Sequence, residues 1–260
     1  MPLQNYVTPH PYPGKLIIVE GIDGSGKSTQ LDLLRKFLES EGHPVHFTEW
    51  NSSALVKDTT KKGKKKKSLT PTTFSILHCC DFAERLAYSI IPPLKGGMLV
   101  LADRYMYTAF ARDVARGVSR KWVRNMYSYA PKPDIAFYFQ ITPEVSVQRI
   151  LSGRPQLKYY EAGLDVMETD DPVESFSRFQ GRIVGEYDEM VDEFGLTVID
   201  GTRPIFTQQQ EMRAIVDEKV GEYLEKSAPP RRAAASRRSS RKKAAPAKKT
   251  TRRKTSKTAG

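Results

Sequence analysis

Nine residues near the N-terminus, GIDGSGKST (21–29), have the types and spacing that bind a phosphate group. Gly21, four residues, and then Gly26, Lys27 and Ser28 fit a P-loop lying between a predicted strand and a predicted helix. Glycines let backbone N–H groups turn toward an anion, and the helix N-terminus adds a positive dipole end. Lys27 would reach the β and γ phosphates, and the Ser28 hydroxyl would ligate Mg²⁺. The alternative, an ordinary glycine turn, is disfavoured by this strand and helix context.

A carboxylate and an arginine, Asp103 and Arg104, end the apolar stretch GGMLVLADRY. In parallel sheets, ligands bind at the carboxyl ends of the strands. A carboxylate there can hold Mg²⁺ through water, and an arginine can fork onto a phosphate. A local ion pair is the alternative, but it does not explain why both residues leave the same strand end. The pair therefore predicts a second part of a phosphate site.

A third cationic segment, RILSGRPQLKYYEAG (149–163), carries Arg149, Arg154 and Lys158 between two predicted helices. Its Gly and Pro residues suit a lid, at about 149–165, whose cations close over a transferring phosphoryl group. A solvated loop with incidental arginines is the alternative.

The elements that must hold these residues alternate between strands and helices, which predicts a five-stranded parallel sheet of α/β class with helices on both faces. Strands are expected at 15–20, 43–50, 96–105, 131–141 and 195–201. A helix follows the P-loop, another runs from Phe74 to Ile91 and is ended by Pro92 and Pro93, and the last runs to about Lys226.

A long helix is expected after Asp171 and Pro172, which suit its cap and first position. Its apolar residues recur at helical spacing, so we expect one inner face. That face comprises Val173, Phe176, Phe179, Ile183, Tyr187, Met190 and Phe194.

The chain has 260 residues and a net charge of +12 that is concentrated at one end. Residues 227–260 hold thirteen Lys and Arg and no acid, which leaves 29 basic and 30 acidic residues elsewhere. This segment has no aromatic or large aliphatic residue, so we expect it to be disordered. It either contacts nucleic acid non-specifically or only solvates the protein. The predicted organisation is an N-terminal extension (1–14), one domain (15–226) and the tail (227–260).

A polar stretch at 51–73 carries six lysines between Lys61 and Lys67 and is predicted to be a mobile loop. The run is either simply solvated or a flap that draws polyanions toward the site.

Two neighbouring cysteines, Cys79 and Cys80, cannot cross-link distant parts of the monomer, which favours a reducing compartment. No apolar stretch approaches the roughly twenty residues that span a bilayer, and the N-terminus lacks a signal-peptide pattern. We therefore expect a cytoplasmic protein without membrane contact.

The order of these motifs resembles the thymidylate kinase family. The matching features are GIDGSGKST, the strand ending DRY, PDIAFYFQITPE with a following arginine, YYEAG and VIDGTR, over residues 15 to about 225. The resemblance implies a P-loop NTPase fold and Mg²⁺-dependent transfer of the ATP γ-phosphate to a nucleoside monophosphate, most simply dTMP. It also implies a homodimer.

Several residues take roles from this resemblance. Asp23 matches an aspartate that faces the acceptor sugar, Arg104 an arginine that grips the acceptor phosphate, and Arg149 the arginine after PE. The loop 198–203 matches one that lies against adenine. The candidate ATP-binding residues are Gly21, Asp23, Gly24, Ser25, Gly26, Lys27, Ser28, Thr29 and Arg203; the candidate catalytic residues are Lys27, Asp103, Arg104, Arg149 and Arg154, with Ser28 and Asp103 as metal ligands.

The acceptor side departs from the family pattern. TEWNSS (48–53) stands where the family reads TREPGG, and the P-loop has Gly24 and Ser25 where some members carry a catalytic arginine, so the lid must supply that charge. The family has a stacking phenylalanine with an arginine four residues later on the helix FSILHCCDFAER, whose register the sequence leaves open. The candidate acceptor residues are Asp23, Phe74, Phe82, Arg85, Arg104, Thr108 and Asp113.

Asp113 is also a hypothetical base reader, because an ionised carboxylate accepts hydrogen bonds from N–H groups. Arg112 would cancel that preference by pairing with it.

Two other functions stay open at this point. A deoxynucleoside kinase would need a general base, for which Glu20 is available, although a carboxylate at a strand end can equally be structural. A nucleic-acid-binding protein with a degenerate kinase domain is the other, which intact Lys27, Ser28, Asp103 and Arg104 argue against.

Overall fold

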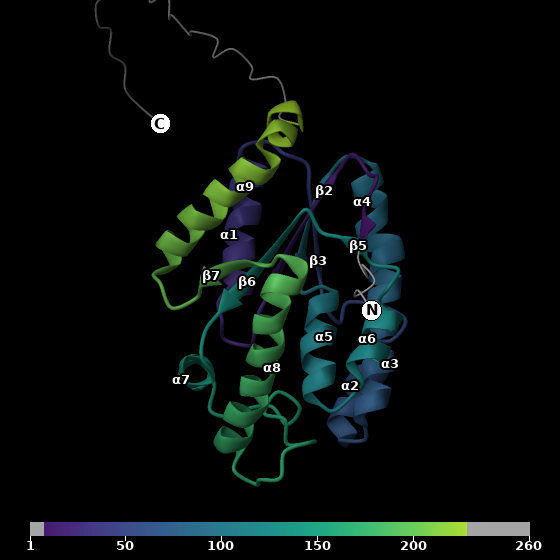
Figure 1. Cartoon of the computed structure of the whole chain (residues 1–260), viewed down its shortest axis with the longest axis vertical. Coiled ribbons are helices and arrows are strands. Elements are labelled where there is room, and N and C mark those ends of the chain that lie inside the picture. Colours follow the sequence, from purple (N-terminus) through teal and green to yellow (C-terminus); the bar gives the residue numbers. More distant parts are fainter. Residues whose placement is uncertain (1–7, 228–260) are drawn as a thin grey trace, which may run out of the picture. The chain divides into compact units, whose positions relative to one another are not determined.

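The structure of the protein is a computed structural model that describes residues 8–227. The expected disorder of the basic tail concerns residues that, except for Ser227, lie outside the described range. Within that range, the central sheet has five parallel strands in the order β3-β4-β2-β6-β7 (Figure 1). Their bounds are β2 Lys15–Glu20, β3 Val45–Glu49, β4 Leu99–Asp103, β6 Ile135–Gln140 and β7 Thr197–Asp200. The predicted parallel α/β fold is confirmed.

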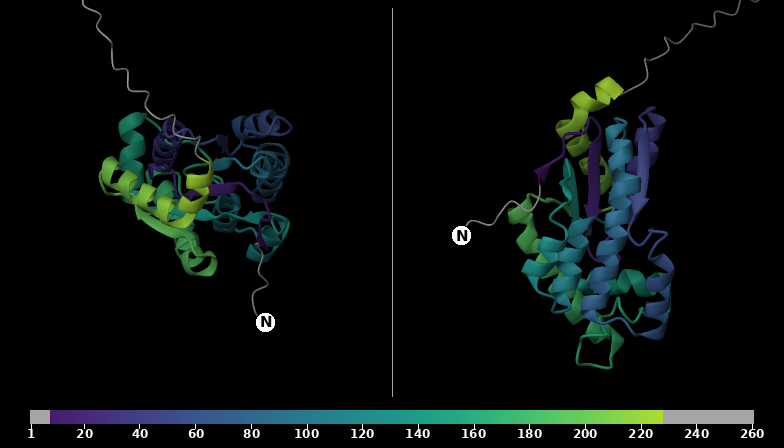
Figure 2. Two further views of the ribbon diagram at one scale, coloured as in Figure 1. Left: turned by 90° about the horizontal axis from the view of Figure 1, so that it is seen from above. Right: turned by 90° about the vertical axis from the view of Figure 1, so that its right-hand side faces the viewer.

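Both faces of the sheet are buried under helices (Figures 1 and 2). In β2, Leu16 and Ile18 point into one core and Ile17 and Val19 into the other, which explains why the strand is apolar at every inner position. Helices α1 (Lys27–Ser40) and α9 (Ile205–Ser227) cover the second of these faces.

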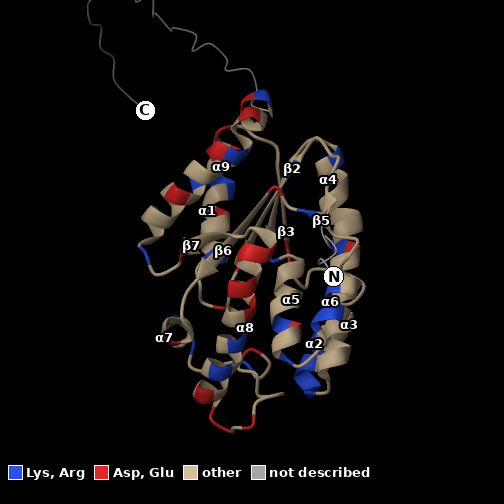
Figure 3. Ribbon diagram, viewed as in Figure 1, with Lys and Arg blue, Asp and Glu red and all other residues tan. Residues whose placement is uncertain are grey.

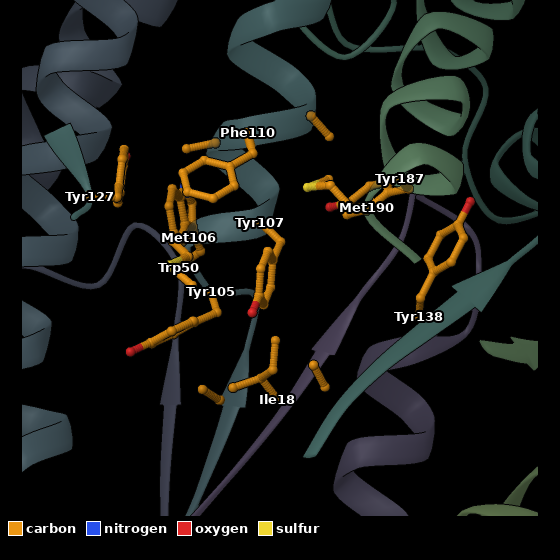
Figure 4. Packing of buried hydrophobic residues seen from close by; sticks show 14 of the residues in the cluster. Ile18, Trp50, Tyr105, Met106, Tyr107, Phe110, Tyr127, Tyr138, Tyr187 and Met190 are labelled. Carbon is orange, nitrogen blue, oxygen red and sulfur yellow. The ribbon is translucent and has the colours of Figure 1, made fainter. Parts of the chain in front are cut away.

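The first face lies under α3 (Pro71–Arg85), α5 (Met106–Ala115) and α8 (Pro172–Phe194). Its core is rich in aromatic rings, including Tyr105, Tyr107, Phe110 and Tyr127 (Figure 4). Tyr138 and Tyr187 stack with ring centroids 4.9 Å apart. These rings fix how α5 and α8 lie on the strands that carry the P-loop and Asp103.

Helix α8 begins as predicted. The Asp171 carboxylate accepts hydrogen bonds from the N–H groups of Val173 and Glu174, and Pro172 follows the cap. The predicted inner face is wrong at Val173, which is 43% exposed because it lies in the first turn, beyond the edge of the core.

The lysine-rich stretch predicted to be a loop contains a helix instead, α2 (Lys57–Lys66). It lacks apolar periodicity and buries only Thr60, so its sequence gave no packing signal. Lysine is a good helix former, and Asp58 in the first turn with Lys64, Lys65 and Lys66 in the last complements the helix dipole.

Pro92 and Pro93 do not end the helical segment, contrary to the prediction. After α3 the chain makes a short π-helical segment, η1 (Leu86–Ile90), and then α4 (Ile91–Lys95). The two prolines fall in the first turn of α4, where the missing N–H of proline is tolerated.

The remaining elements frame this domain. Strand β1 (Thr8–Pro9) pairs with β5 (Pro131–Lys132), while α6 (Arg120–Met126) and α7 (Pro143–Gly153) connect the core elements. Among the described residues, no helix is both long enough and apolar enough to cross a membrane.

Candidate active site

The P-loop is shaped by glycines in left-handed backbone conformations. Gly26, the residue before α1, has φ of 89°, and a Cβ on Gly21 would lie 2.7 Å from the Phe139 carbonyl oxygen. Lys27 is the first residue of α1 and is buried, with Nζ 3.5 Å from the Ile22 carbonyl oxygen. Burial and the nearby Arg104 lower the pKa of Lys27 to about 8. The loop therefore presents a cation and a helix N-terminus at one point.

Arg104 lies directly after β4 and is held in a strained conformation, with φ of 68°. Its guanidinium donates to the Gly21 carbonyl oxygen at 3.1 Å and to Thr108 Oγ1 at 3.3 Å, and it pairs with Asp23. A non-glycine residue in this region is uncommon and concentrates at functional sites. The bonds aim the guanidinium at the P-loop.

Asp23 joins the P-loop to two cations, one directly after β4 and one on α5. Its carboxylate pairs with Arg104 and, at 2.8 Å, with Arg112 of α5. Burial raises the pKa of Asp23, but Arg112, Arg104 and Lys27 outweigh it and hold this pKa well below its usual range. Arg112 thus pairs with Asp23, which corrects the expectation that it would pair with Asp113.

Two adjoining cavities lie at the carboxyl end of the sheet, and Asp23 and Arg112 line both. The smaller is about 280 Å³ and polar, lined by Asp23, Lys27, Ser28, Glu49, Trp50, Asn51, Asp103, Arg104 and Arg112. The larger, about 420 Å³, is lined by Phe74 and His78 of α3, cations of α2 and α5, and residues 158–161. Its size is within the range of small-molecule sites. A polar chamber lined by cations thus adjoins one lined partly by aromatic rings.

The register of α3, which the sequence left open, puts Phe74 and His78 in the larger cavity. Phe82 is fully buried against the rings of Tyr105 and Tyr127 and lines neither cavity. Arg85 is also buried, with Nε donating to Thr48 Oγ1 at 3.2 Å. Phe74 is therefore the candidate stacking ring, and Phe82 and Arg85 support the site from the core.

Thr108 and Glu20 form a buried structural link rather than a surface of the site. The Glu20 carboxylate accepts from Thr108 Oγ1 at 2.5 Å, from the Tyr105 N–H at 2.7 Å and from Tyr187 Oη at 2.8 Å. Burial raises the pKa of Glu20, and the residue lines neither cavity. It is placed to hold the start of α5, not to remove a proton from a sugar hydroxyl.

Asp113 lies behind the larger cavity. It is 1% exposed, and its Oδ2 accepts from Ser75 Oγ at 2.6 Å. His78 stands on the cavity side, with Nδ1 3.9 Å from Asp113 Oδ1. Asp113 is therefore not placed to contact a ligand directly.

The first residues of the segment predicted to be a lid, 149–165, belong to a helix. Arg149 belongs to helix α7 and donates to the Gly24 carbonyl oxygen at 3.3 Å and the Gly201 carbonyl oxygen at 2.9 Å. Arg149 therefore contacts the P-loop and the loop after β7 from a helix. Arg154 follows α7 and pairs with Glu161.

The residues of the predicted lid that line the larger cavity are Lys158, Tyr159, Tyr160 and Glu161. Two of them, Tyr159 and Tyr160, also contact the segment that follows α2. Tyr160 Oη accepts from the Leu69 N–H at 3.1 Å, and Lys67 Nζ lies 4.4 Å from the centroid of the Tyr159 ring. Arg116, which follows α5, donates to the Tyr160 carbonyl oxygen at 2.6 Å. Lys and Arg gather on α2 at this end of the molecule (Figure 3).

Arg203, expected near adenine, is exposed and pairs with Asp200 and Glu211. The loop that contains Arg203 is linked to the P-loop by Arg149, which donates to the carbonyl oxygens of Gly201 and Gly24.

The sequence reasoning missed His78, Arg116, Lys64 and Tyr160 as residues of the larger cavity. One signal was present, because His78 follows Phe74 by four residues, the spacing at which the family has its arginine. Arg116, Lys64 and Tyr160 are brought together only by the packing of α2, α5 and the lid.

Comparison with known proteins agrees with this geometry. The family model for thymidylate kinase matches residues 19–206. The chain is 44% identical over 215 residues to the probable thymidylate kinase 2 of Saccharolobus solfataricus, covering 82% of this chain and 99% of that protein. It is 29% identical over 165 residues to the thymidylate kinase of Brachyspira hyodysenteriae, covering 63% of this chain and 81% of that protein.

Proposed function

This chain belongs to the thymidylate kinase family, and on that premise we propose that it transfers the ATP γ-phosphate to dTMP, giving dTDP and ADP. The observation that carries the proposal is the pair of adjoining cavities that share Asp23 and Arg112. The polar chamber beside Lys27 suits the phosphates, and the chamber with Phe74 suits a base. An acceptor lying across both would present its phosphate to the P-loop.

The acceptor phosphate needs no protein base, because phosphate monoesters are largely dianionic at pH 7. Its oxygen attacks the γ-phosphorus in line, the bond to the bridging oxygen breaks, and ADP leaves with that electron pair. Catalysis then depends on positioning and on charge stabilisation. Buried Glu20 is consistent with this reaction, and a deoxynucleoside kinase would require a different group as base.

Each charged residue of the polar chamber has a role in this reaction. Lys27 stabilises charge on the β and γ phosphates, and Arg104 holds the acceptor phosphate against the P-loop. Gly24 and Ser25 leave the P-loop without an arginine, so Arg112 and the lid residue Lys158 supply further positive charge near the acceptor. Arg154 would join them only if it left Glu161.

The donor set fits Mg²⁺. The Ser28 hydroxyl and the Asp103 carboxylate line the same chamber. Among residues 8–227, no group of three or more His, Cys, Asp or Glu side chains could hold a metal. Mg²⁺ at nucleotide sites is usually bound through one or two carboxylates together with substrate phosphates and water. When bound there, Mg²⁺ neutralises charge on the transferring phosphates.

A homodimer is supported by exposed apolar residues on one side of α3 and η1. Ile76 is 50% exposed and Tyr88 is 77% exposed, with exposed Cys80 between them at helical spacing. Exposed apolar groups mark an interaction surface where they form a contiguous patch. Light scattering should show a dimer that Ile76→Glu dissociates.

The basic tail supports a non-specific contact with nucleic acid, because residues 227–260 carry thirteen cations and no acid. Deleting them should abolish retention on DNA at low salt and leave the kinase kinetics nearly unchanged. Equal retention by the shortened chain would contradict this contact.

A coupled assay of ADP release tests the function with a panel of nucleosides and nucleoside monophosphates. We expect dTMP to give the highest kcat/KM. Activity on thymidine without activity on any monophosphate would contradict the proposal and indicate a deoxynucleoside kinase. No ATP-dependent turnover with any acceptor would favour a degenerate kinase domain.

A further inference from the structure

His78 is a buried residue whose hydrogen-bonding capacity is unused. It is 2% exposed, and neither ring nitrogen has a partner among the described residues. The side chain lines the larger cavity beside Phe74, whose ring centroid is 4.3 Å away. Because buried polar groups are nearly always paired, an unpaired imidazole at a cavity wall points to a ligand atom.

The charge of Asp113 favours one tautomer of His78. Its Oδ1 lies 3.9 Å from His78 Nδ1 and has no other partner, while Ser75 Oγ holds Oδ2 at 2.6 Å. A carboxylate only accepts hydrogen bonds, so it favours the tautomer with the proton on Nδ1. His78 Nε2 is then left as an acceptor.

Burial and two nearby cations keep the His78 imidazole neutral. Burial lowers the pKa of His78, Lys64 and Arg112 lower it further, and Asp113 opposes them without reversing the shift. The other faces of the ring meet Phe74 and Trp50, which carry no charge. At neutral pH, therefore, the cavity wall offers a hydrogen-bond acceptor.

We propose that His78 selects the acceptor base, with Nε2 accepting the N3–H of a thymine or uracil ring that lies against Phe74, and with Asp113 as the positioning residue. The inference rests on the proposed function, because it takes the acceptor to be a pyrimidine nucleoside monophosphate. Cytosine carries a lone pair at N3, so the same wall would face it with a second acceptor and disfavour it.

Calorimetric titration of the full chain with dTMP and dCMP, without ATP, tests the selection. His78→Ala should reduce the ratio of the dCMP and dTMP dissociation constants by about tenfold or more, because it removes one buried hydrogen bond and one repulsion. Thr72→Ala, at an exposed position of the same helix, is the matched control and should leave the ratio unchanged. An unchanged ratio in His78→Ala would overturn the proposal.

Asp113→Asn separates a positioning role from a structural one. An amide nitrogen facing Nδ1 donates to it, which moves the proton to Nε2 and turns the wall into a donor. The preference should then shift toward dCMP, whereas a purely structural role would weaken both ligands equally. Should the variant fail to fold, ¹⁵N NMR of the wild-type complex with dTMP gives the same information, since a protonated Nε2 would contradict the proposal.

These measurements remain distinct from the test of the reaction. A chain that binds dTMP through His78 but transfers no phosphate would contradict the proposed function alone. A chain that phosphorylates dTMP, and whose base preference survives His78→Ala, would contradict the selection alone.

Discussion

The two halves of the site are built in different ways. The donor half is a contiguous loop whose backbone turns at Gly21 and Gly26 place Lys27 at a helix N-terminus. The acceptor half consists of side chains from α2, α3, α5 and the lid, which meet only through packing. Because the first depends on spacing along the chain and the second on the fit between helices, the donor half tolerates little change and the acceptor half can be rebuilt residue by residue.

Lys27→Ala should have the largest effect and would test the donor half. Turnover should fall by on the order of 10³-fold, because the transferring phosphates lose a charge that stabilises the transition state. ADP release measures the loss, and thermal unfolding should show that the chain still folds. Lys36→Ala, on the exposed side of the same helix, should behave as wild type. Full turnover in Lys27→Ala would contradict the assignment of residues 21–29 as a phosphate-binding P-loop.

Arg104→Ala should come next and would show where the halves meet. The Michaelis constant for the acceptor should rise about ten- to a hundredfold and that for ATP much less, because a charge-assisted fork to the acceptor phosphate is lost. Arg104→Lys keeps the charge without the fork and should lie between. A rise confined to ATP would place Arg104 on the donor side and contradict its role.

Arg149→Ala should have a smaller effect, on ATP alone. The structure ties Arg149 to the carbonyl oxygens of Gly24 and Gly201, so its loss should raise the ATP Michaelis constant by roughly three- to tenfold. As a lid residue, its expected effect would instead have been on turnover. Steady-state kinetics beside Arg154→Ala, which lies in the lid, distinguish the two positions. Reduced turnover at an unchanged ATP constant would restore the lid interpretation.

The smallest effect concerns pH and the acceptor half. Burial, with Arg112 and Arg116, lowers the pKa of Lys64 to about 8 from an ordinary 10.5, so this cation of the larger cavity loses its proton as the pH rises above 8. Acceptor binding should therefore weaken by less than about tenfold between pH 7 and 9. Lys64→Met should bind more weakly at pH 7 and lose most of this dependence. An acceptor affinity independent of pH in the wild type would contradict the assignment.

The sequence predicted the donor half because its residues are contiguous and each has a backbone reason to be there. It also predicted the sheet, since buried parallel strands are apolar at every inner position, as in β2. It did not predict α2, whose helix has no apolar face, or the start of the lid after α7. Asp113 shows why the acceptor half was harder to predict. Its role depends on Ser75 and His78 of α3, and only the packing of α3 against α5 brings these residues beside it.

The left-handed backbone at Arg104 means that the residue best for folding differs from the residue needed for function. A side chain in that conformation costs about 1–3 kcal/mol, which glycine would recover. Random drift under selection for folding alone would therefore move position 104 away from arginine, and only selection for phosphate transfer would return it. Among diverged or decayed copies of this gene, the residue at this one position would separate those still under selection for catalysis from those preserved only as folded protein.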